Sequence, residues 1–362
     1  MNQSRFLFIG ALPDPENKHP GGQASATQGI LDYCNLNDIN VDIIDSAQNS
    51  FPFPSVYLRI SRAIKRNLKL LFKLFRFNYN GIIIFCGEGF SFVEKSFSVF
   101  LCRIFRIKTV LSIRSGFFMD EIKSSKLKKN IYSLLLKLPN FHVVQGTKWK
   151  ALLISLGIDQ EKITIIPNWA SAEFESSEDI KVATKKETIK FLYVGWMVKE
   201  KGVSHILEAS QELEEKDSFE VYMVGGGTLY EELLKKANEN SQENIKFLGW
   251  KNKLEVLRLM QTCHVLILPS YAEGFPNVVV EALSQNMPLI TTDVGGIGDS
   301  SIDCVNSFIV KVGDTKDLFN SMQKFISDPS IIEEFSKNSY KIFNRRHRME
   351  RNCPKYFNIF QD

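Results

Sequence analysis

The sequence predicts an α/β fold with two doubly wound parallel sheets that face each other across a cleft. Short apolar runs, typical of buried strands, alternate with longer segments of helical character along nearly the whole chain. This alternation is typical of parallel sheets covered by helices. A polar, acid-rich stretch near residue 180 interrupts the pattern, which then starts again. The 362 residues are enough for two domains that each have a core of their own.

The first domain is predicted to cover residues 1–170. Its strands are expected near residues 5–11, 41–44, 81–86, 108–113, 141–144 and 162–166, and its helices at 22–35, 55–76, 91–106, 124–138 and 147–156. The apolar run that starts at Arg5 is too short for the core of a signal peptide and soon meets two prolines, so it is predicted as the first strand.

A linker is predicted at residues 171–188, which are polar and have no clear period. The second domain is predicted at 189–343, with strands at 189–194, 219–224, 245–248, 265–268, 288–292 and 308–310 and a first helix from Val203. In the last segment, 344–362, residues 344–360 have helical character, and we expect this helix to pack back on the first domain. Ligands of doubly wound sheets bind at the carboxyl ends of the strands.

The composition is that of a globular protein, and no apolar run approaches the roughly 20 residues that span a bilayer. The simplest expectation is a cytoplasmic protein. None of the six cysteines has a partner at C-x-x-C spacing, so neither a zinc site nor a redox motif is predicted. Small buried cysteines in a reducing compartment are the better interpretation.

The first half of the chain is strongly basic. No Asp or Glu occurs between Ser46 and Gly87, and residues 56–76 combine apolar residues at helical spacing with seven Lys or Arg. Such a helix either lies on an anionic membrane surface or is a domain helix with a solvated basic side. The basic charge would also suit nucleic acid, but no zinc-finger, helix-turn-helix or RNP pattern supports this partner.

The most informative segment runs from Leu266 to Leu283. An apolar strand ends at Pro269, a turn carries Glu273, and Pro276 stands where a helix begins, with Glu281 inside that helix. A helix start binds phosphate, and carboxylates accept hydrogen bonds from sugar hydroxyls. The segment therefore predicts a nucleotide-sugar site. Outside this context, the two acids would be a turn residue and a solvated helix residue.

This segment resembles the Glu-x7-Glu signature of the family 4 retaining glycosyltransferases of the GT-B fold (glycosyl transferases group 1). Other segments match the family in the expected order, namely Gly21-Gly22, Pro167-Asn168-Trp169, Val194–Gly202, Gly225-Gly226-Gly227, Phe247–Gly249 and Thr292–Gly296. The resemblance is dense from about residue 189 to residue 310 and thinner in the first half. It implies two Rossmann-like domains, with the donor on the second and the acceptor on the first.

The resemblance also implies a role for each matched residue. Lys201 would neutralise the leaving diphosphate, Glu273 would contact the transferred sugar, and Glu281 would bind the ribose hydroxyls. Glu273 and Lys201 are thus the predicted catalytic residues. The other predicted donor-binding residues are Gly21, Gly22, Gly195, Lys199, Gly225, Gly226, Gly249, Gly274, Phe275, Pro276, Asn277 and Val278. Taken singly, Lys201 could be a solvated lysine, and the first two glycines an ordinary turn.

Three sites differ from simple expectations. Trp196 stands where the family usually has Arg, so Lys199 or Lys201 must supply the positive charge. Arg114 stands where the family often has His; because Arg cannot act as a base at neutral pH, we expect Arg114 to bind an anion or a sugar of the acceptor. The run from Gly225 is not a G-x-G-x-x-G dinucleotide fingerprint, so hydride transfer is disfavoured.

These observations predict a retaining, metal-independent glycosyltransferase for bacterial cell-surface polysaccharide such as O-antigen, capsule or exopolysaccharide. The donor would be a UDP-sugar or GDP-sugar and the acceptor a glycan, free or linked to polyprenyl diphosphate. No cofactor or metal is expected, and the protein would be cytoplasmic or peripheral on the inner face of the cytoplasmic membrane. The alternatives are a nucleotide-sugar epimerase, a phosphorylase of the same fold, and a nucleotide-sugar-binding scaffold without turnover.

Overall fold

The computed structural model of the chain divides into two compact units. The structure describes residues 4–13, 22–47, 54–174, 178–184, 186–213 and 218–361. Unit 1 comprises Met1–Asn168 and Met349–Asp362, and unit 2 comprises Trp169–Arg348. The chain thus passes between the units after residues 168 and 348, whereas the sequence analysis placed the boundaries at 170 and 343.

Unit 1 contains a six-stranded parallel sheet with the order β2-β1-β3-β4-β5-β6. The strands are β1 (Arg5–Gly10), β2 (Asn40–Asp45), β3 (Gly81–Cys86), β4 (Thr109–Ile113), β5 (Phe141–Val144) and β6 (Ile163–Ile165). All six lie within two residues of their predicted positions. The central strands are buried along their whole length, which is why they read as continuous apolar runs in the sequence.

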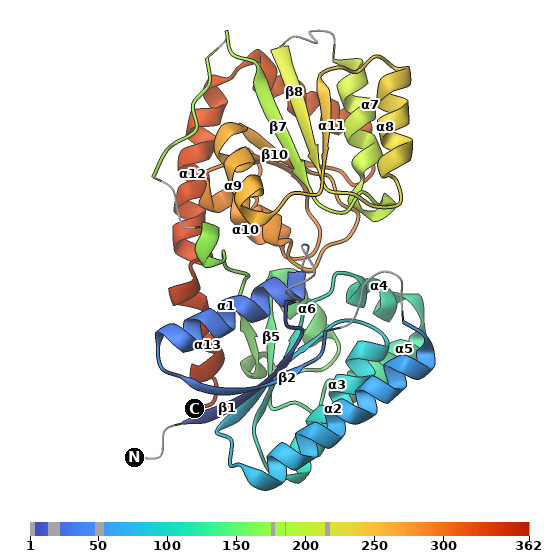
Figure 1. Cartoon of the computed structure of the whole chain (residues 1–362), viewed down its shortest axis with the longest axis vertical. Helices are drawn as coiled ribbons and strands as arrows, with labels where there is room; N and C mark the ends of the chain where they lie inside the picture. The colour runs from blue at the N-terminus through green and yellow to red at the C-terminus, as the bar shows by residue number, and fades with distance from the viewer. Residues whose placement is uncertain are drawn as a thin grey trace. The chain divides into compact units, whose positions relative to one another are not determined.

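The helices of unit 1 follow the prediction with one correction. They are α1 (Gly22–Leu36), α2 (Val56–Arg76), α3 (Phe90–Ile104), α4 (Phe117–Ser124), α5 (Lys126–Leu135) and α6 (Thr147–Ser155) (Figure 1). The helix predicted at 124–138 corresponds to α5, whereas α4 was not predicted; the two helices meet at Ser125. This residue has extended φ and ψ, and its hydroxyl accepts a hydrogen bond from the Lys128 amide at 3.5 Å. Ser125 therefore ends one helix and caps the next.

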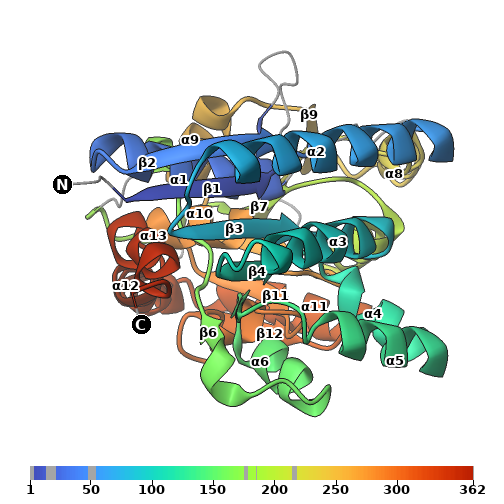
Figure 2. The ribbon, with the colours of Figure 1, turned by 90° about the horizontal axis from the view of Figure 1, so that it is seen from below.

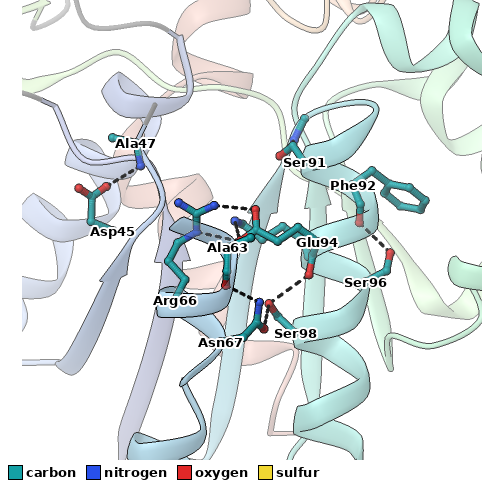
Figure 3. Close-up of polar contacts among 12 residues, drawn as sticks. Asp45, Ala47, Ala63, Arg66, Asn67, Ser91, Phe92, Glu94, Ser96 and Ser98 are labelled. Atoms are coloured by element: carbon teal, nitrogen blue, oxygen red, sulfur yellow. Dashed lines mark hydrogen bonds and ion pairs between the residues drawn. The ribbon is translucent and has the colours of Figure 1, made fainter. Parts of the chain in front are cut away.

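A polar contact fixes α2 against α3 (Figure 3). Arg66 of α2 binds Glu94 of α3 through two hydrogen bonds of 2.7 and 2.8 Å. One turn further on, the Ser98 hydroxyl donates to the Asn67 side-chain oxygen at 2.9 Å. Burial alone would raise the pKa of Glu94, but the bond from Arg66 and the charge of Lys95 outweigh it and hold that pKa below its usual value. The buried carboxylate is thus ionised and paired.

The C-terminal segment is not one continuous helix. α12 (Ser330–Arg346) ends in unit 2, where the buried His347 bonds to the Ser300 hydroxyl at 2.8 Å, and α13 (Met349–Asn358) begins in unit 1. α13 packs against α1, and its Phe357 ring contacts Phe6 of β1 with centroids 5.1 Å apart. The last helix therefore completes the core of unit 1.

Unit 2 contains a second six-stranded parallel sheet with the order β12-β11-β10-β7-β8-β9. Its strands are β7 (Ile189–Val194), β8 (Phe219–Val224), β9 (Ile245–Gly249), β10 (Val265–Leu268), β11 (Leu289–Thr292) and β12 (Ser307–Val310). The other helices are α7 (Val203–Glu212), α8 (Tyr230–Glu239), α9 (Lys253–Thr262), α10 (Asn277–Ser284) and α11 (Thr315–Ser327). The predicted strands again match closely, because they are the most apolar runs in this half.

Most of the predicted linker belongs to unit 2 in the structure. Phe174 is fully buried in the core of that unit. The Lys181 ammonium donates to the carbonyls of Met260 and Gln261, at 2.6 Å each, at the end of α9. Residues 175–177 and 185 lie outside the described residues. The acidic composition and the lack of hydrophobic periodicity predicted a linker, but tertiary contacts hold the described part of this segment in place.

Candidate functional site

The order of the strands in unit 2 creates a topological switch point beside β7. From β7 the chain proceeds to β8 and β9 on one side, and β10 then returns to the other side of β7. The loops that follow β7 and β10 therefore leave the sheet edge in opposite directions. In open parallel sheets the ligand binds at this point, outside the carboxyl ends of the strands. These two loops carry Lys201 and Glu273.

The loop after β7 is held close to the loop after β10. It forms a short 3-10 turn, Lys199–Lys201, and ends at Gly202, which has a φ of +65°. A Cβ atom at Gly202 would lie 2.2 Å from the carbonyl oxygen of Pro269. Only glycine permits this approach and this backbone conformation. The Tyr271 amide also donates to the Glu200 carbonyl at 2.8 Å, so backbone contacts join the two loops.

The two predicted catalytic residues are in direct contact. Lys201 Nζ lies 2.5 Å from Glu273 Oε1, and the Ser270 hydroxyl donates to the same carboxylate oxygen at 2.8 Å. Glu273 is buried, with 8% of its surface exposed, while a quarter of the Lys201 side chain remains accessible. The site thus holds a cation and an anion side by side at the switch point. The ammonium can contact an anionic ligand, and the carboxylate can accept bonds from hydroxyl groups.

The second acid of the motif has a different environment. Glu281 lies in the second turn of α10 and is half-buried. In the part of the chain that the structure describes, no hydrogen bond or ion pair engages its carboxylate. Burial raises the pKa of Glu281 to about 7; the charge of Lys253 opposes this effect, and that of Glu173 adds to it. A neighbouring group that donates a hydrogen bond would stabilise the ionised carboxylate.

The start of α10 has no side-chain cap. Its N-cap residue is Pro276, whose side chain cannot accept a hydrogen bond, and the helix begins at Asn277, one residue later than predicted. Phe275 is buried against His347, with ring centroids 5.3 Å apart. The Gly274 carbonyl accepts a bond from the Gly296 amide at 2.8 Å. The loop from Gly274 to Val278 is therefore fixed at one end, and its role in phosphate binding stays a prediction.

The glycines at the ends of β7, β8 and β9 contact one another. A Cβ atom at Gly225, where φ is +128°, would lie 1.9 Å from the carbonyl oxygen of Gly195. One at Gly226 would lie 2.6 Å from the indole nitrogen of Trp250. The Gly225 amide donates to the Gly249 carbonyl at 2.8 Å. These glycines therefore permit close packing of three loops, and binding of a nucleotide by them stays a prediction.

A pair of tryptophans marks the same edge of the sheet. Trp196 and Trp250 are partly exposed, at 42% and 37%, and their rings meet edge to face with centroids 4.8 Å apart. Trp196 was expected only as a departure from the family, and Trp250 was not predicted. The signal available in the sequence was that each Trp directly follows a glycine at a strand end. Lys199, the other predicted donor-binding lysine, is exposed.

A second group that sequence reasoning missed supports the Glu273 loop. His205 Nε2 lies 2.8 Å from the Tyr271 hydroxyl, and His205 Nδ1 lies 2.7 Å from the Thr315 hydroxyl. Because Tyr271 is two residues before Glu273, this contact anchors the loop to α7 and α11. The residues are far apart in the sequence, so no local pattern indicates their contact.

The predicted site residues of unit 1 have a different setting. Gly21 lies outside the described residues, and Gly22 is the first residue of α1. Arg114 is buried: it donates to the Tyr356 hydroxyl at 3.1 Å and to Asn168, and its guanidinium lies over the Phe85 ring. These contacts join β4 to α13 within unit 1. Acceptor binding by Arg114 stays a prediction that these internal contacts do not support.

Among the residues that the structure describes, no three His, Cys, Asp or Glu side chains are grouped as metal ligands would be. Within the same described ranges, no helix combines the length and the apolar character needed to cross a bilayer.

Comparisons with known proteins relate this chain to glycosyltransferases. Residues 175–342 match the model of the family described as glycosyl transferases group 1. A relative described as an uncharacterized glycosyltransferase of Methanocaldococcus jannaschii is 30% identical over 160 residues, which are 44% of each chain. The O-antigen chain mannosyltransferase C of Escherichia coli is 25% identical over 207 residues, which are 56% of this chain and 55% of the relative. The chain thus matches about half the length of these curated relatives.

The whole fold also has a solved counterpart. The sucrose-phosphate synthase of Thermosynechococcus elongatus superposes with a TM-score of 0.81 over 99% of this chain and 98% of its own, at 15% sequence identity. This similarity shows the fold, which is GT-B. The matched family segment contains Lys201, Glu273 and Glu281, the residues that the switch point of unit 2 presents. The second unit of the chain is thus similar to the group 1 glycosyltransferases, whose family model it matches over residues 175–342.

Proposed function

We propose that this chain transfers a sugar from a nucleotide-diphosphate donor to a glycan or lipid-linked acceptor in the synthesis of bacterial cell-surface polysaccharide. One observation carries the proposal: Lys201 and Glu273 lie 2.5 Å apart at the switch point of the unit that matches the family. The name of the Escherichia coli relative, an O-antigen chain mannosyltransferase, supports the acceptor class. The activity as a whole is inferred from a match to about half of that relative.

Each residue of the pair has a role in the proposed reaction. As the bond to the diphosphate breaks, negative charge grows on the leaving group, and the Lys201 ammonium would stabilise it. Glu273 would accept hydrogen bonds from the transferred sugar and place its anomeric carbon beside the acceptor hydroxyl. The Glu281 carboxylate, which has a raised pKa, would gain a partner from the ribose hydroxyls.

The donor is tested by a thermal-shift screen with UDP-, GDP-, ADP- and CMP-sugars, because a ligand that binds only the folded state raises the melting temperature. We expect a UDP-sugar or a GDP-sugar to give the largest shift. Release of the nucleoside diphosphate that depends on an acceptor would exclude an epimerase. A phosphorylase would instead depend on inorganic phosphate.

The residues are tested by Lys201→Ala and Glu273→Ala. Each should lower kcat at least 100-fold, as loss of one electrostatic contact to a transition state does. Lys235→Ala and Glu239→Ala provide the matched control, because these residues form an exposed pair on α8 at 3.7 Å. Normal turnover in both site variants would refute the assignment. Donor binding without turnover in the wild type would favour the scaffold, an alternative that the departures from the family at Trp196 and Arg114 suggest.

The finer features of the proposal have direct tests. A retaining enzyme gives a product whose anomeric configuration matches that of the donor, which proton NMR of the product measures. A metal-independent enzyme keeps its turnover after dialysis against EDTA. A lipid-linked acceptor would place the protein at the inner face of the cytoplasmic membrane, where fractionation of cells that express the tagged chain would find it.

A further inference from the structure

The helix α2 has an inner face that is firmly bound to unit 1. Its buried residues are Ala63, Asn67, Leu70 and Leu74, which share one side of a helix. The ion pair between Arg66 and Glu94 fixes the same side against α3 (Figure 3). The outer residues of α2 therefore face solvent in the folded unit, and the helix cannot rotate to bury them.

The outer side of α2 carries a second apolar stripe. Exposed fractions are 87% for Tyr57, 55% for Ile64, 61% for Leu68, 62% for Phe72 and 78% for Phe75. At about 100° per residue, these five side chains fall within an arc of roughly 80°. A helix on the surface of a globular domain normally has polar residues there. An exposed apolar stripe of this size indicates an interaction surface.

Basic residues occupy the adjoining arc of α2. Lys65, Lys69 and Arg76 are exposed, and within the described ranges no carboxylate forms an ion pair with them. They lie on an arc of roughly 40° directly beside the apolar stripe. The segment between Ser46 and Gly87 contains no acidic residue that could neutralise them. The outer side of the helix is therefore apolar on one flank and cationic on the other.

The neighbouring helix α3 extends the apolar surface. Val93, Phe97, Phe100 and Ile104 are between 45% and 60% exposed and follow an i, i+4, i+7, i+11 pattern, which places them on one stripe. α2 and α3 run side by side in both ribbon views (Figures 1 and 2), and the Phe75 ring contacts Phe105 at the end of α3, with centroids 4.9 Å apart. Two neighbouring helices thus present apolar side chains to solvent.

We infer that the outer faces of α2 and α3 form a docking surface for a bilayer that contains anionic phospholipid. An apolar stripe flanked by Lys and Arg is the arrangement of a helix that lies in the interface of such a membrane. A second copy of the chain is a poorer occupant, because two clusters of unneutralised cations would then face each other. The inference concerns the surface that meets the lipid and stands independently of the donor and the reaction proposed above.

Vesicle flotation of the full chain tests this inference. Wild type should bind vesicles of phosphatidylglycerol mixed with phosphatidylcholine and should bind phosphatidylcholine alone much more weakly. Lys65→Gln, Lys69→Gln and Arg76→Gln combined should weaken binding on the order of 100-fold, since each basic residue near an anionic surface contributes roughly fivefold. Leu68→Ser with Phe72→Ser should weaken binding at least 10-fold by removing the inserted side chains.

Matched controls are available in unit 2. Lys235→Gln, Lys316→Gln and Lys337→Gln remove the same charge from another surface, and Leu254 is 58% exposed, so Leu254→Ser matches the apolar change. These controls should float as wild type does, and all variants should keep the wild-type melting temperature. Wild type that does not bind anionic vesicles, or surface variants that bind as wild type does, would overturn the inference. A wild-type dimer that Leu68→Ser with Phe72→Ser converts to a monomer would also overturn it, by showing that a second copy covers this surface.

Discussion

Replacement of Glu281 by Gln should stabilise the protein at pH 8 and have a smaller effect at pH 5. The pKa of this carboxyl group rises from an ordinary value of 4.5 to about 7, mainly through burial. A raised pKa in an acid means that the folded state binds the proton more tightly than the unfolded state does. As the pH increases above 4.5, the unfolded chain ionises first, and the folded state loses relative stability until about pH 7.

The size of the effect follows from the same shift. One pKa unit corresponds to about 1.4 kcal/mol, so ionisation of Glu281 should cost the folded state about 3 kcal/mol at pH 8 and about 1 kcal/mol at pH 5. Gln keeps the shape of the side chain and removes the charge. For a unit of this size, a gain of 3 kcal/mol corresponds to an increase in melting temperature of roughly 6 to 12 °C.

The assay is a thermal melt of wild type and Glu281→Gln at pH 5, 6, 7 and 8 without a ligand. Glu231→Gln is the control, because Glu231 is an exposed glutamate in the first turn of α8, and its melting temperature should stay close to that of wild type at each pH. If the difference in melting temperature between Glu281→Gln and wild type were the same at pH 5 and pH 8, burial would not control the pKa of this carboxyl group. A destabilised variant at pH 8 would refute the reasoning outright.

Three further predictions concern packing, a buried charge and the donor. Gly225→Ala should lower the free energy of unfolding in urea by at least 2 kcal/mol, because its Cβ would lie 1.9 Å from the Gly195 carbonyl oxygen. Gly249→Ala has open space around its Cβ and should lower the free energy of unfolding by only about 1 kcal/mol. Glu94→Gln should lower the free energy of unfolding by about 3 to 5 kcal/mol in the same measurement, since the buried Lys95 and the half-buried Arg66 lose their partner, and an unchanged midpoint would contradict this ion-pair assignment. Trp196→Arg should raise the affinity for UDP or GDP roughly 10-fold by calorimetry, since guanidinium binds phosphate in bidentate fashion; weaker binding would show that the indole itself contributes.

The strands and most helices could be predicted because their signals are local. β3 and β4 are buried on both faces, so their sequences are unbroken apolar runs. Two features of the structure differ from the prediction. α4, which ends at Ser124, was not predicted, and Lys181 secures a segment of linker composition through distant carbonyls. Side-chain bonding of this kind leaves no periodic pattern in the sequence.

The site could be predicted as a set of residues but not as an arrangement. Resemblance to the family identified Lys201 and Glu273 separately, with one assigned to the diphosphate and the other to the sugar. Their contact depends on β10 lying beside β7 in the sheet. The order of the strands along the chain does not specify which strands are neighbours in the sheet. The supporting contact between His205 and Tyr271 depends on the same pairing, and so it was missed.

The contact between Lys201 and Glu273 affects how loss of either residue must be interpreted. Glu273 is buried, so removal of Lys201 leaves a carboxylate with the Ser270 hydroxyl as its remaining side-chain partner among the described residues. An unpaired buried charge is costly, and the loop after β10 would move to expose it. A single variant can therefore lose activity through a displaced loop as well as through a missing contact to the donor. Melting temperature separates the two effects. A displaced loop lowers the melting temperature of the ligand-free protein. A missing donor contact leaves that temperature unchanged and reduces only the shift that the donor produces.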